Sequence, residues 1–215
     1  DGGNTLRAYD LVDGALRWQL PEADGAPHAL ATWFSGPPLV TGSELYVLAE
    51  QGGEVRLECR STDDGSLRWQ QPLANYDDSE TITNPEARSR RLAGLTPALA
   101  DGVIVCPLGA GCVVAVDAAS RSLLWAHAYA RFTPDEHERG GGALLSAGEP
   151  TAILAQGFAV VSPYDGPGLV CLRLRDGHPV WHQPKRGRSR VAGIVNNCLI
   201  VVSDTAVESL EVATG

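Results

Sequence analysis

The sequence contains no methionine, and only 6% of its 215 residues are aromatic. It has no apolar run of the roughly 18 residues that a membrane-spanning helix needs, because glycine, proline or a charged residue interrupts every hydrophobic stretch. A net charge of −9 disfavours general nucleic-acid binding, which requires a basic surface. With 44% hydrophobic and 20% charged residues the chain is nevertheless expected to fold around a core. We therefore expect no transmembrane segment and no nucleic-acid partner.

Catalytic signatures are also missing. The sequence has no Gly-x-Ser-x-Gly elbow, no Walker loop and no His-Glu-x-x-His helix. His178 and His182 could share one face of a strand, but a zinc site needs three or four ligands, so two ordinary histidines are favoured. Cys106 and Cys112 flank a turn and could form a disulfide, with two buried thiols as the alternative. No metal ligand and no catalytic residue is predicted.

What the sequence does contain is a repeat. A pattern of small-x-polar-x-x-x-Gly-x-x-x-Trp starts at residues 8, 59, 115 and 171, and a copy starting at 209 is interrupted when the chain ends at Gly215. Before each copy after the first, the interrupted one included, come two short apolar or β-branched runs, separated by turns rich in Gly or Asn. Each motif supplies two further strands, and four antiparallel strands per roughly 50 residues are typical of a β-propeller blade.

The motif positions have physical reasons. Position one is small because a neighbouring blade or backbone comes close, and position seven is Gly because the hairpin turn requires a left-handed residue. Arg121 occupies position seven in the third copy, so that turn should differ from the others or be strained. Each Trp is expected to be buried between adjacent blades rather than to bind a ligand. The residues expected to join the blades are Ala8, Asp10, Gly14, Trp18, Gly65, Trp69, Ala115, Asp117, Trp125, Gly177 and Trp181.

These copies resemble the quinoprotein, or PQQ-like, repeat, whose tryptophan-docking motif is Ala-x-Asp-x-x-x-Gly-x-x-x-Trp. Kelch repeats have a similar period, but their Gly-Gly pair is not repeated here. Ser61, Arg173 and Glu211 depart from the motif Asp, so its hydrogen bond to the turn is not assured in those copies. The resemblance implies an all-β protein, a β-propeller of four-stranded antiparallel blades, here a partial ring of about four blades. It also implies an extracytoplasmic location and a non-catalytic role.

The resemblance also bears on which cofactors are expected. Quinone-dependent dehydrogenases of this fold hold PQQ over a pair of adjacent cysteines, with calcium nearby. The five cysteines here, at 59, 106, 112, 171 and 198, include no adjacent pair. No cofactor is therefore expected, and PQQ with calcium would require further blades to complete a site.

The chain is predicted to be one propeller segment over residues 1–215, cut from a longer protein, since it starts without Met and shows no signal peptide. Rings of this type usually close with seven or eight blades, and a dimer completing eight blades is the alternative. The predicted blade pieces are 1–21, 36–70, 92–126, 151–182 and 191–215.

Long loops near residues 20–36, 71–92, 127–150 and 183–190 should all open on one face, because each joins an outermost strand to the next innermost strand. Propellers bind partners on such faces, whereas charged loops that only keep the face soluble are the alternative. The predicted partner-binding residues are Trp33, Arg88, Arg90, Arg91, Arg188 and Arg190.

Two functions remain open. The first is a non-catalytic scaffold that binds a protein partner, or the rest of its own propeller, within a larger bacterial envelope protein. The second is part of a quinone-dependent dehydrogenase, or another propeller enzyme, whose catalytic residues lie outside this segment.

Overall fold

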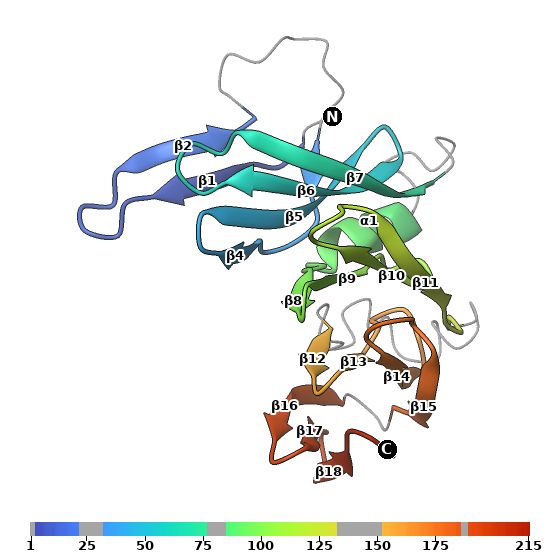
Figure 1. Cartoon of the computed structure of the whole chain (residues 1–215). Helices are drawn as coiled ribbons and strands as arrows, with labels where there is room; N and C mark the ends of the chain where they lie inside the picture. The colour runs from blue at the N-terminus through green and yellow to red at the C-terminus, as the bar shows by residue number, and fades with distance from the viewer. Residues whose placement is uncertain (1–2, 22–31, 77–84, 133–151, 186–188) are drawn as a thin grey trace. The chain divides into compact units, whose positions relative to one another are not determined.

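The structure, a computed structural model, describes residues 3–21, 32–76, 85–132, 152–185 and 189–215. The chain forms an all-β protein built of antiparallel sheets that correspond to propeller blades, so the predicted fold class is confirmed (Figure 1). It divides into two compact units, Asp1–Gly94 (unit 1) and Leu95–Gly215 (unit 2).

Unit 1 contains a two-stranded hairpin, a larger sheet and a short helix. The hairpin pairs β1 with β2, and the sheet has the order β3-β5-β6-β7, with β4 also pairing with β5. Its elements are β1 (Leu6–Tyr9), β2 (Leu16–Leu20), β3 (Trp33–Phe34), β4 (Leu39–Thr41), β5 (Glu44–Gln51), β6 (Glu54–Ser61), β7 (Leu67–Asn75) and α1 (Pro85–Leu92). The hairpin packs through Leu6, Trp18 and Leu20 on the buried β3–β5 residues Phe34, Leu45, Val47 and Ala49.

Unit 2 contains three successive sheets, whose first strands β8, β12 and β16 lie side by side (Figure 1). The sheet orders are β11-β10-β9-β8, β12-β13-β14-β15 and β16-β17-β18. The strands are β8 (Ala98–Ala100), β9 (Val103–Pro107), β10 (Cys112–Asp117), β11 (Leu123–Ala128), β12 (Ile153–Ala155), β13 (Phe158–Val161), β14 (Gly168–Arg173), β15 (Pro179–Pro184), β16 (Arg190–Val195), β17 (Cys198–Val202) and β18 (Val207–Glu211). Aliphatic side chains of neighbouring sheets form its two core clusters.

Two segments predicted as loops have regular structure. Strand β4 pairs with only the first residues of β5, so the other end of β5 is covered by β3 through the pairs Trp33 with Glu50 and Phe34 with Ala49. The prediction of a loop from 71 to 92 is also wrong. Strand β7 continues to Asn75, and α1 occupies the end of that range.

The small residue at position one of each complete motif lies directly opposite the motif Trp on the next strand. The pairs are Ala8 with Trp18, Cys59 with Trp69, Ala115 with Trp125 and Cys171 with Trp181, and each is followed by a β-bulge. A large side chain at position one would compete with the indole for the same space. The cross-strand tryptophan thus adds a reason for the small residue that the sequence reasoning did not include.

All five motif turns have the same backbone. The position-seven N–H donates to the position-three carbonyl in each copy, for example Gly14 to Asp10 at 3.0 Å and Gly177 to Arg173 at 2.9 Å. Arg121 makes the same bond to Asp117 and has φ of 61°, inside the left-handed region that Gly14 adopts at 72°. The turn with Arg therefore keeps the common form and carries the left-handed strain, so the strained alternative is the one observed.

Side chains other than the motif Asp bond the turn in copies where that Asp is replaced. Asp10 accepts the Val12 N–H at 2.8 Å, and Asp117 accepts the Ser120 N–H at 2.6 Å. In the second copy the Ser61 hydroxyl accepts the Asp63 N–H instead, at 3.2 Å. In the fourth copy Asp176, at position six, accepts the His178 N–H at 3.0 Å.

Three motif tryptophans contact the turn of the following motif. The indole N–H donates to the position-four carbonyl: Trp18 to Thr62 at 3.0 Å, Trp125 to Leu174 at 2.9 Å and Trp181 to Val212 at 2.7 Å. The ring lies over the position-seven glycine of the same turn, and a Cβ atom added at Gly177 would be 2.6 Å from the Trp125 ring. Glycine at position seven thus allows the left-handed backbone of the turn and also leaves space for the indole ring.

This double requirement predicts unequal costs for two alanine substitutions. Gly14→Ala should cost about 1 kcal/mol, the strain of a left-handed alanine, because no described atom lies within 4 Å of its Cβ. Gly177→Ala should cost about 2–4 kcal/mol, since the methyl must also displace Trp125. Urea unfolding of both variants measures the difference, and equal costs would show that the indole contact adds nothing.

Among the described residues no helix is long and apolar enough to cross a membrane. All five cysteines are described and are free thiols, so the disulfide alternative for Cys106 and Cys112 is wrong. The register explains this, because Cys106 faces Val114 across the sheet rather than Cys112. Burial raises the pKa of both thiols.

Candidate functional site

The candidate site lies at the sheet ends where the second strand turns into the third and where the outermost strand leaves the blade. We call these ends the loop face of each unit. In three blades the residue after the outermost strand donates its N–H to the residue before the third strand: Tyr76 to Gly53, Tyr129 to Gly111 and Lys185 to Pro167, each at 2.8 Å. The loops therefore start from the same place in each of these blades.

The loop face of unit 1 holds a buried ion-pair cluster. Glu50, at the end of β5, is 2% exposed and accepts from two arginines of α1. Arg91 donates from Nε at 3.0 Å and from Nη2 at 2.6 Å to Oε1, and Arg90 donates from Nε to Oε2 at 3.3 Å. A carboxylate with this burial is stable as an anion only when paired, so the two arginines and Glu50 depend on one another.

Aromatic side chains complete this cluster. The Arg90 guanidinium lies over the Tyr76 ring at 3.7 Å from its centroid, and the Arg91 guanidinium lies 5.9 Å from the Trp33 ring. The Trp33 indole N–H also donates to the Arg91 carbonyl at 3.0 Å. These contacts fasten α1 to β3 and β5.

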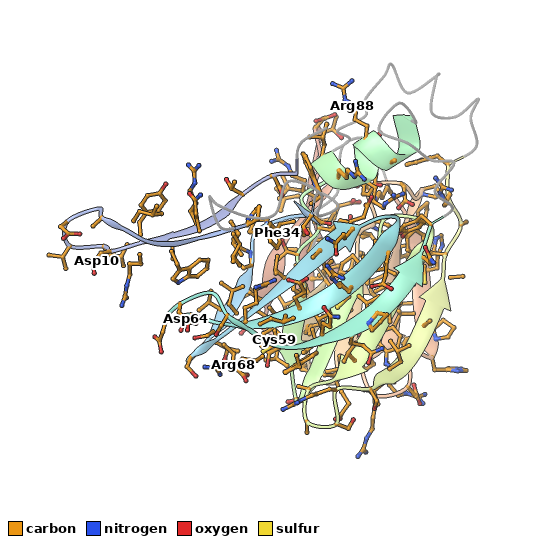
Figure 2. All side chains as sticks on the ribbon, turned by 90° about the horizontal axis from the view of Figure 1, so that it is seen from above. Asp10, Phe34, Cys59, Asp64, Arg68 and Arg88 are labelled. Atoms are coloured by element: carbon orange, nitrogen blue, oxygen red, sulfur yellow. The ribbon has the colours of Figure 1, made fainter. Side chains whose placement is uncertain are left out.

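The predicted partner-binding residues therefore differ in their exposure. Arg90 is 4% exposed, and its burial against Glu50 corrects the expectation that it extends from an open loop. Arg91 and Trp33 are half-buried beside it, whereas Arg88 is exposed and points away from the sheet (Figure 2). Arg190 is exposed at the start of β16, and Arg188 lies outside the described residues.

Removing the charge of Glu50 should destabilise unit 1 strongly. We expect Glu50→Gln to cost about 3–5 kcal/mol, because two arginines would lose their shared carboxylate. As a control, Arg173→Gln breaks an ion pair with Asp176 whose side chains are 54% and 51% exposed. That change should cost less than about 1 kcal/mol. Chemical denaturation compares the two variants, and a Glu50→Gln cost as small as the control would contradict the cluster's role.

The loop face of unit 2 is organised by Asp165, in the β13–β14 loop. Its carboxylate accepts the Gly111 N–H at 2.9 Å and the Tyr129 hydroxyl at 2.7 Å, and Arg131 lies at 3.5 Å. Its backbone carbonyl accepts the Phe132 N–H at 2.9 Å. One buried aspartate thus ties the loop of one blade to the turn and the outgoing loop of the preceding blade. Burial, and then the Asp165 charge, raise the pKa of Tyr129.

Lys185 is the only lysine of the chain and lies next to this cluster. Its ammonium donates to the Pro163 carbonyl. Burial lowers the pKa of Lys185 to about 8, although the Asp165 charge acts in the opposite direction. Lys185 is therefore a basic group whose charge changes near pH 8.

The lowered pKa predicts a pH-dependent stability. In the folded chain Lys185 releases its proton near pH 8, whereas the unfolded chain keeps it until about 10.5, the ordinary value. Between these values the unfolded state binds more protons, so stability attributable to Lys185 rises with pH. Urea unfolding of the wild type and of Lys185→Gln at pH 7 and pH 10 tests this. The free energy of unfolding of the wild type should increase relative to the variant, and a constant difference would refute the shift.

Sequence reasoning did not identify Glu50, Tyr129, Asp165 and Lys185 as site residues. The available signal was position, since Glu50 and Asp165 lie at the turn between the second and third strands of their blades. The partners of the two carboxylates come from segments 34 to 54 residues away, which spacing alone does not reveal.

The residues that the structure describes offer no donor set that fits PQQ and calcium. No two cysteines are adjacent. Within residues 3–21, 32–76, 85–132, 152–185 and 189–215 no group of three or more His, Cys, Asp or Glu side chains could hold a metal ion. The carboxylates that are buried on the loop faces are bonded to arginine, tyrosine and backbone N–H groups.

Blades of four antiparallel strands with an indole bonded to the next motif define a PQQ-like repeat β-propeller. The chain belongs to the family described as "Outer membrane protein assembly factor BamB", which matches residues 1–183 and 109–215. A comparison with curated protein sequences gave no match.

Solved structures share the fold. The crystal structure of BamB from Moraxella catarrhalis is 14% identical with a TM-score of 0.64, and the match covers 100% of this chain and 54% of that one. The quinohemoprotein alcohol dehydrogenase ADHIIG from Pseudomonas putida HK5 is 11% identical with a TM-score of 0.53, covering 87% of this chain and 34% of that one. The chain thus spans about half the length of the BamB structure.

Proposed function

We propose that this chain is a non-catalytic propeller segment that binds a protein partner through its loop faces, as part of an assembly factor in the bacterial cell envelope. The observation that carries the proposal is the match of the BamB family along the whole chain. The family description names outer membrane protein assembly, which is a task of binding rather than of bond chemistry.

The loop faces support this proposal because some of their charged side chains are buried and others are exposed. Glu50, Arg90 and Asp165 are buried and hold the loops in place. Arg88 and Arg190 are exposed and basic on a chain with a net charge of −9. Arg88 lies on α1 and Arg190 in the first position of β16, so both exposed cations are carried by regular elements. They suit an acidic surface of a partner, because complementary charge guides association without requiring a flexible loop to become ordered.

Charge reversal tests the proposal. The wild type, the double variant Arg88→Glu/Arg190→Glu and the control Arg175→Glu are immobilised and exposed to a solubilised envelope extract from the source organism. Arg175 is exposed in the turn before β15, at the strand end opposite the loop face of unit 2. Partner capture should fall at least tenfold for the double variant and stay unchanged for the control. Equal capture by all three proteins would refute loop-face binding.

A dehydrogenase fragment is the competing function, because a quinohemoprotein dehydrogenase shares the fold. Incubation with PQQ and calcium, followed by gel filtration, distinguishes the two functions. We expect no quinone absorption to remain with the protein, since the described residues offer no ligand group of three. Stoichiometric retention of the quinone would favour the dehydrogenase instead.

A further inference from the structure

Two serine hydroxyls of unit 2 are buried, and neither has a hydrogen-bond partner among the residues that the structure describes. Ser162 follows β13 and is 1% exposed, and Ser189 precedes β16 and is 5% exposed. Native proteins rarely bury a hydroxyl without a partner, because the group loses its hydrogen bonds to water and gains none in return. Two such groups in one unit therefore indicate a ligand that bonds them.

Both serines lie at the same end of one interface between sheets. The β12–β15 and β16–β18 sheets are neighbours (Figure 1), and their shared core cluster contains Val160 of β13 and Val191 of β16. Each serine is two residues from one of these valines, in the direction of the loop face. Alternate residues of an extended strand share a side. The two hydroxyls therefore continue the interface from its opposite sides toward the loop face.

A lysine reaches the same place. Lys185 follows β15, on which Trp181 packs against the same core cluster. The lysine is four residues further along, so its side chain leaves the strand on the side of Trp181. Its ammonium donates to the carbonyl of Pro163, the residue after Ser162. An ammonium and two buried hydroxyls thus meet at the loop-face end of this interface.

These polar residues depart from the pattern of the other sheets. The position of Ser162 is two residues after the cross-strand partner of motif position one, and in the other sheets it holds Leu48, Pro107 and Val202. The position of Lys185 is the residue after the outermost strand, and it holds Tyr76 and Tyr129 in the two preceding sheets. Polar groups at positions that are otherwise apolar or aromatic are typical of a functional site.

We propose that Ser162, Ser189 and Lys185 form a binding site for a small carboxylate with one negative charge. The two hydroxyls can donate, and an ammonium has N–H groups beyond the one that bonds Pro163, so the site requires a ligand that accepts several hydrogen bonds. A carboxylate accepts on two oxygens and donates none. One ammonium, with the Asp165 charge acting on it, suits a single negative charge better than the two of sulfate.

The electrostatics of Lys185 agree with an anionic ligand. Burial lowers the pKa of Lys185 to about 8, and a bound carboxylate would raise it again because it stabilises the ammonium. Asp165 cannot replace the ligand, since its oxygens already accept from Gly111 and Tyr129 and lie 3.5 Å from Arg131.

Other charged or titratable groups belong to the elements around the site. They are Asp165, Tyr129, Arg131, Tyr164, Arg190, Asp204 and Glu208. Carboxylates, guanidinium groups and tyrosine hydroxyls ordinarily keep their charge between pH 7 and pH 9. A change in carboxylate binding over that range therefore reports on Lys185.

The proposal goes beyond partner binding by the exposed arginines. The site lies between two sheets and uses neither Arg88 nor Arg190. Variants of the serines and charge reversal of the arginines can thus fail or succeed separately.

The test is an NMR titration of the full chain labelled with 13Cε-lysine, which gives one side-chain signal because Lys185 is the only lysine. Acetate at constant ionic strength and pH 7 should shift this signal saturably and raise the pKa of Lys185. Sulfate should bind at least tenfold more weakly than acetate. The acetate affinity should fall several-fold at pH 9, where the unliganded lysine is mostly neutral.

A second probe identifies the source of the carboxylate. N-acetylglycine carries its carboxylate at the end of a peptide group. If it binds as tightly as acetate, the natural ligand is the terminal carboxylate of a larger molecule. Binding at least tenfold weaker than that of acetate assigns the site to a free small acid.

Serine variants make the result specific. Ser162→Ala and Ser189→Ala should each weaken acetate binding several-fold, and the double variant should weaken it at least tenfold, because each change removes one donor. Ser122→Ala is the matched control, since its hydroxyl is exposed in the β10–β11 turn at the opposite strand end, and it should leave binding unchanged. Amide spectra of all variants report whether the fold is retained.

Three outcomes would overturn the proposal. The first is equal acetate affinity in the wild type and in the folded serine variants. The second is a lysine shift that grows linearly with salt or is as large with sulfate, which would show a general ionic effect. The third is a long-lived water in contact with both serines that acetate does not displace, which would assign the hydroxyls to an internal water.

Discussion

The contact between one motif tryptophan and the turn of the next motif is the interaction on which the rest of the structure depends. In this contact the indole N–H donates to a backbone carbonyl, and the indole ring lies over a glycine. It therefore requires a tryptophan in one motif and a residue without a side chain in the next. Strands β2, β7, β11 and β15, which carry the motif tryptophans, are edge strands whose backbone groups pair on one side only. The tryptophans of β2, β11 and β15 therefore both anchor an edge strand and connect it to the next motif.

The loop faces depend on this regularity and add a second kind of contact. Once the blades are fixed, the loops leave from equivalent places, and buried carboxylates can reach from one loop to another. Glu50 does so for α1, and Asp165 does so for the segments around Gly111 and Tyr129. Arg88 remains exposed on the same helix that Glu50 holds in place.

The fold was readable from the sequence because its main determinants are local and repeated. Glycine, tryptophan and the small residue at position one recur in a fixed frame, so periodicity revealed them. The turn at Arg121 shows the limit of that reasoning. The sequence indicated an anomaly, but only the structure shows that the residue adopts the left-handed form of its glycine counterparts.

The candidate site was less predictable for a physical reason. Arg88 and Arg90 are the same residue type, two positions apart in one short helix. Arg90 is nevertheless buried against Glu50, whereas Arg88 is exposed. Which arginine turns inward depends on where a carboxylate lies forty residues earlier in the chain. The strand β3 was missed for a similar reason, since it exists to cover the part of β5 that β4 leaves open.

The uniform motif turn has a consequence for how such an array changes in length. Every motif turn has the same backbone hydrogen bond. The contact between a tryptophan and the next turn therefore does not depend on which copy of the motif supplies the tryptophan. Inserting or deleting a whole copy would leave the remaining junctions intact, whereas a change of a few residues would break one. Architectures held by nearest-neighbour contacts of this kind vary by whole modules, and damage at one junction stays local to the two blades that share it.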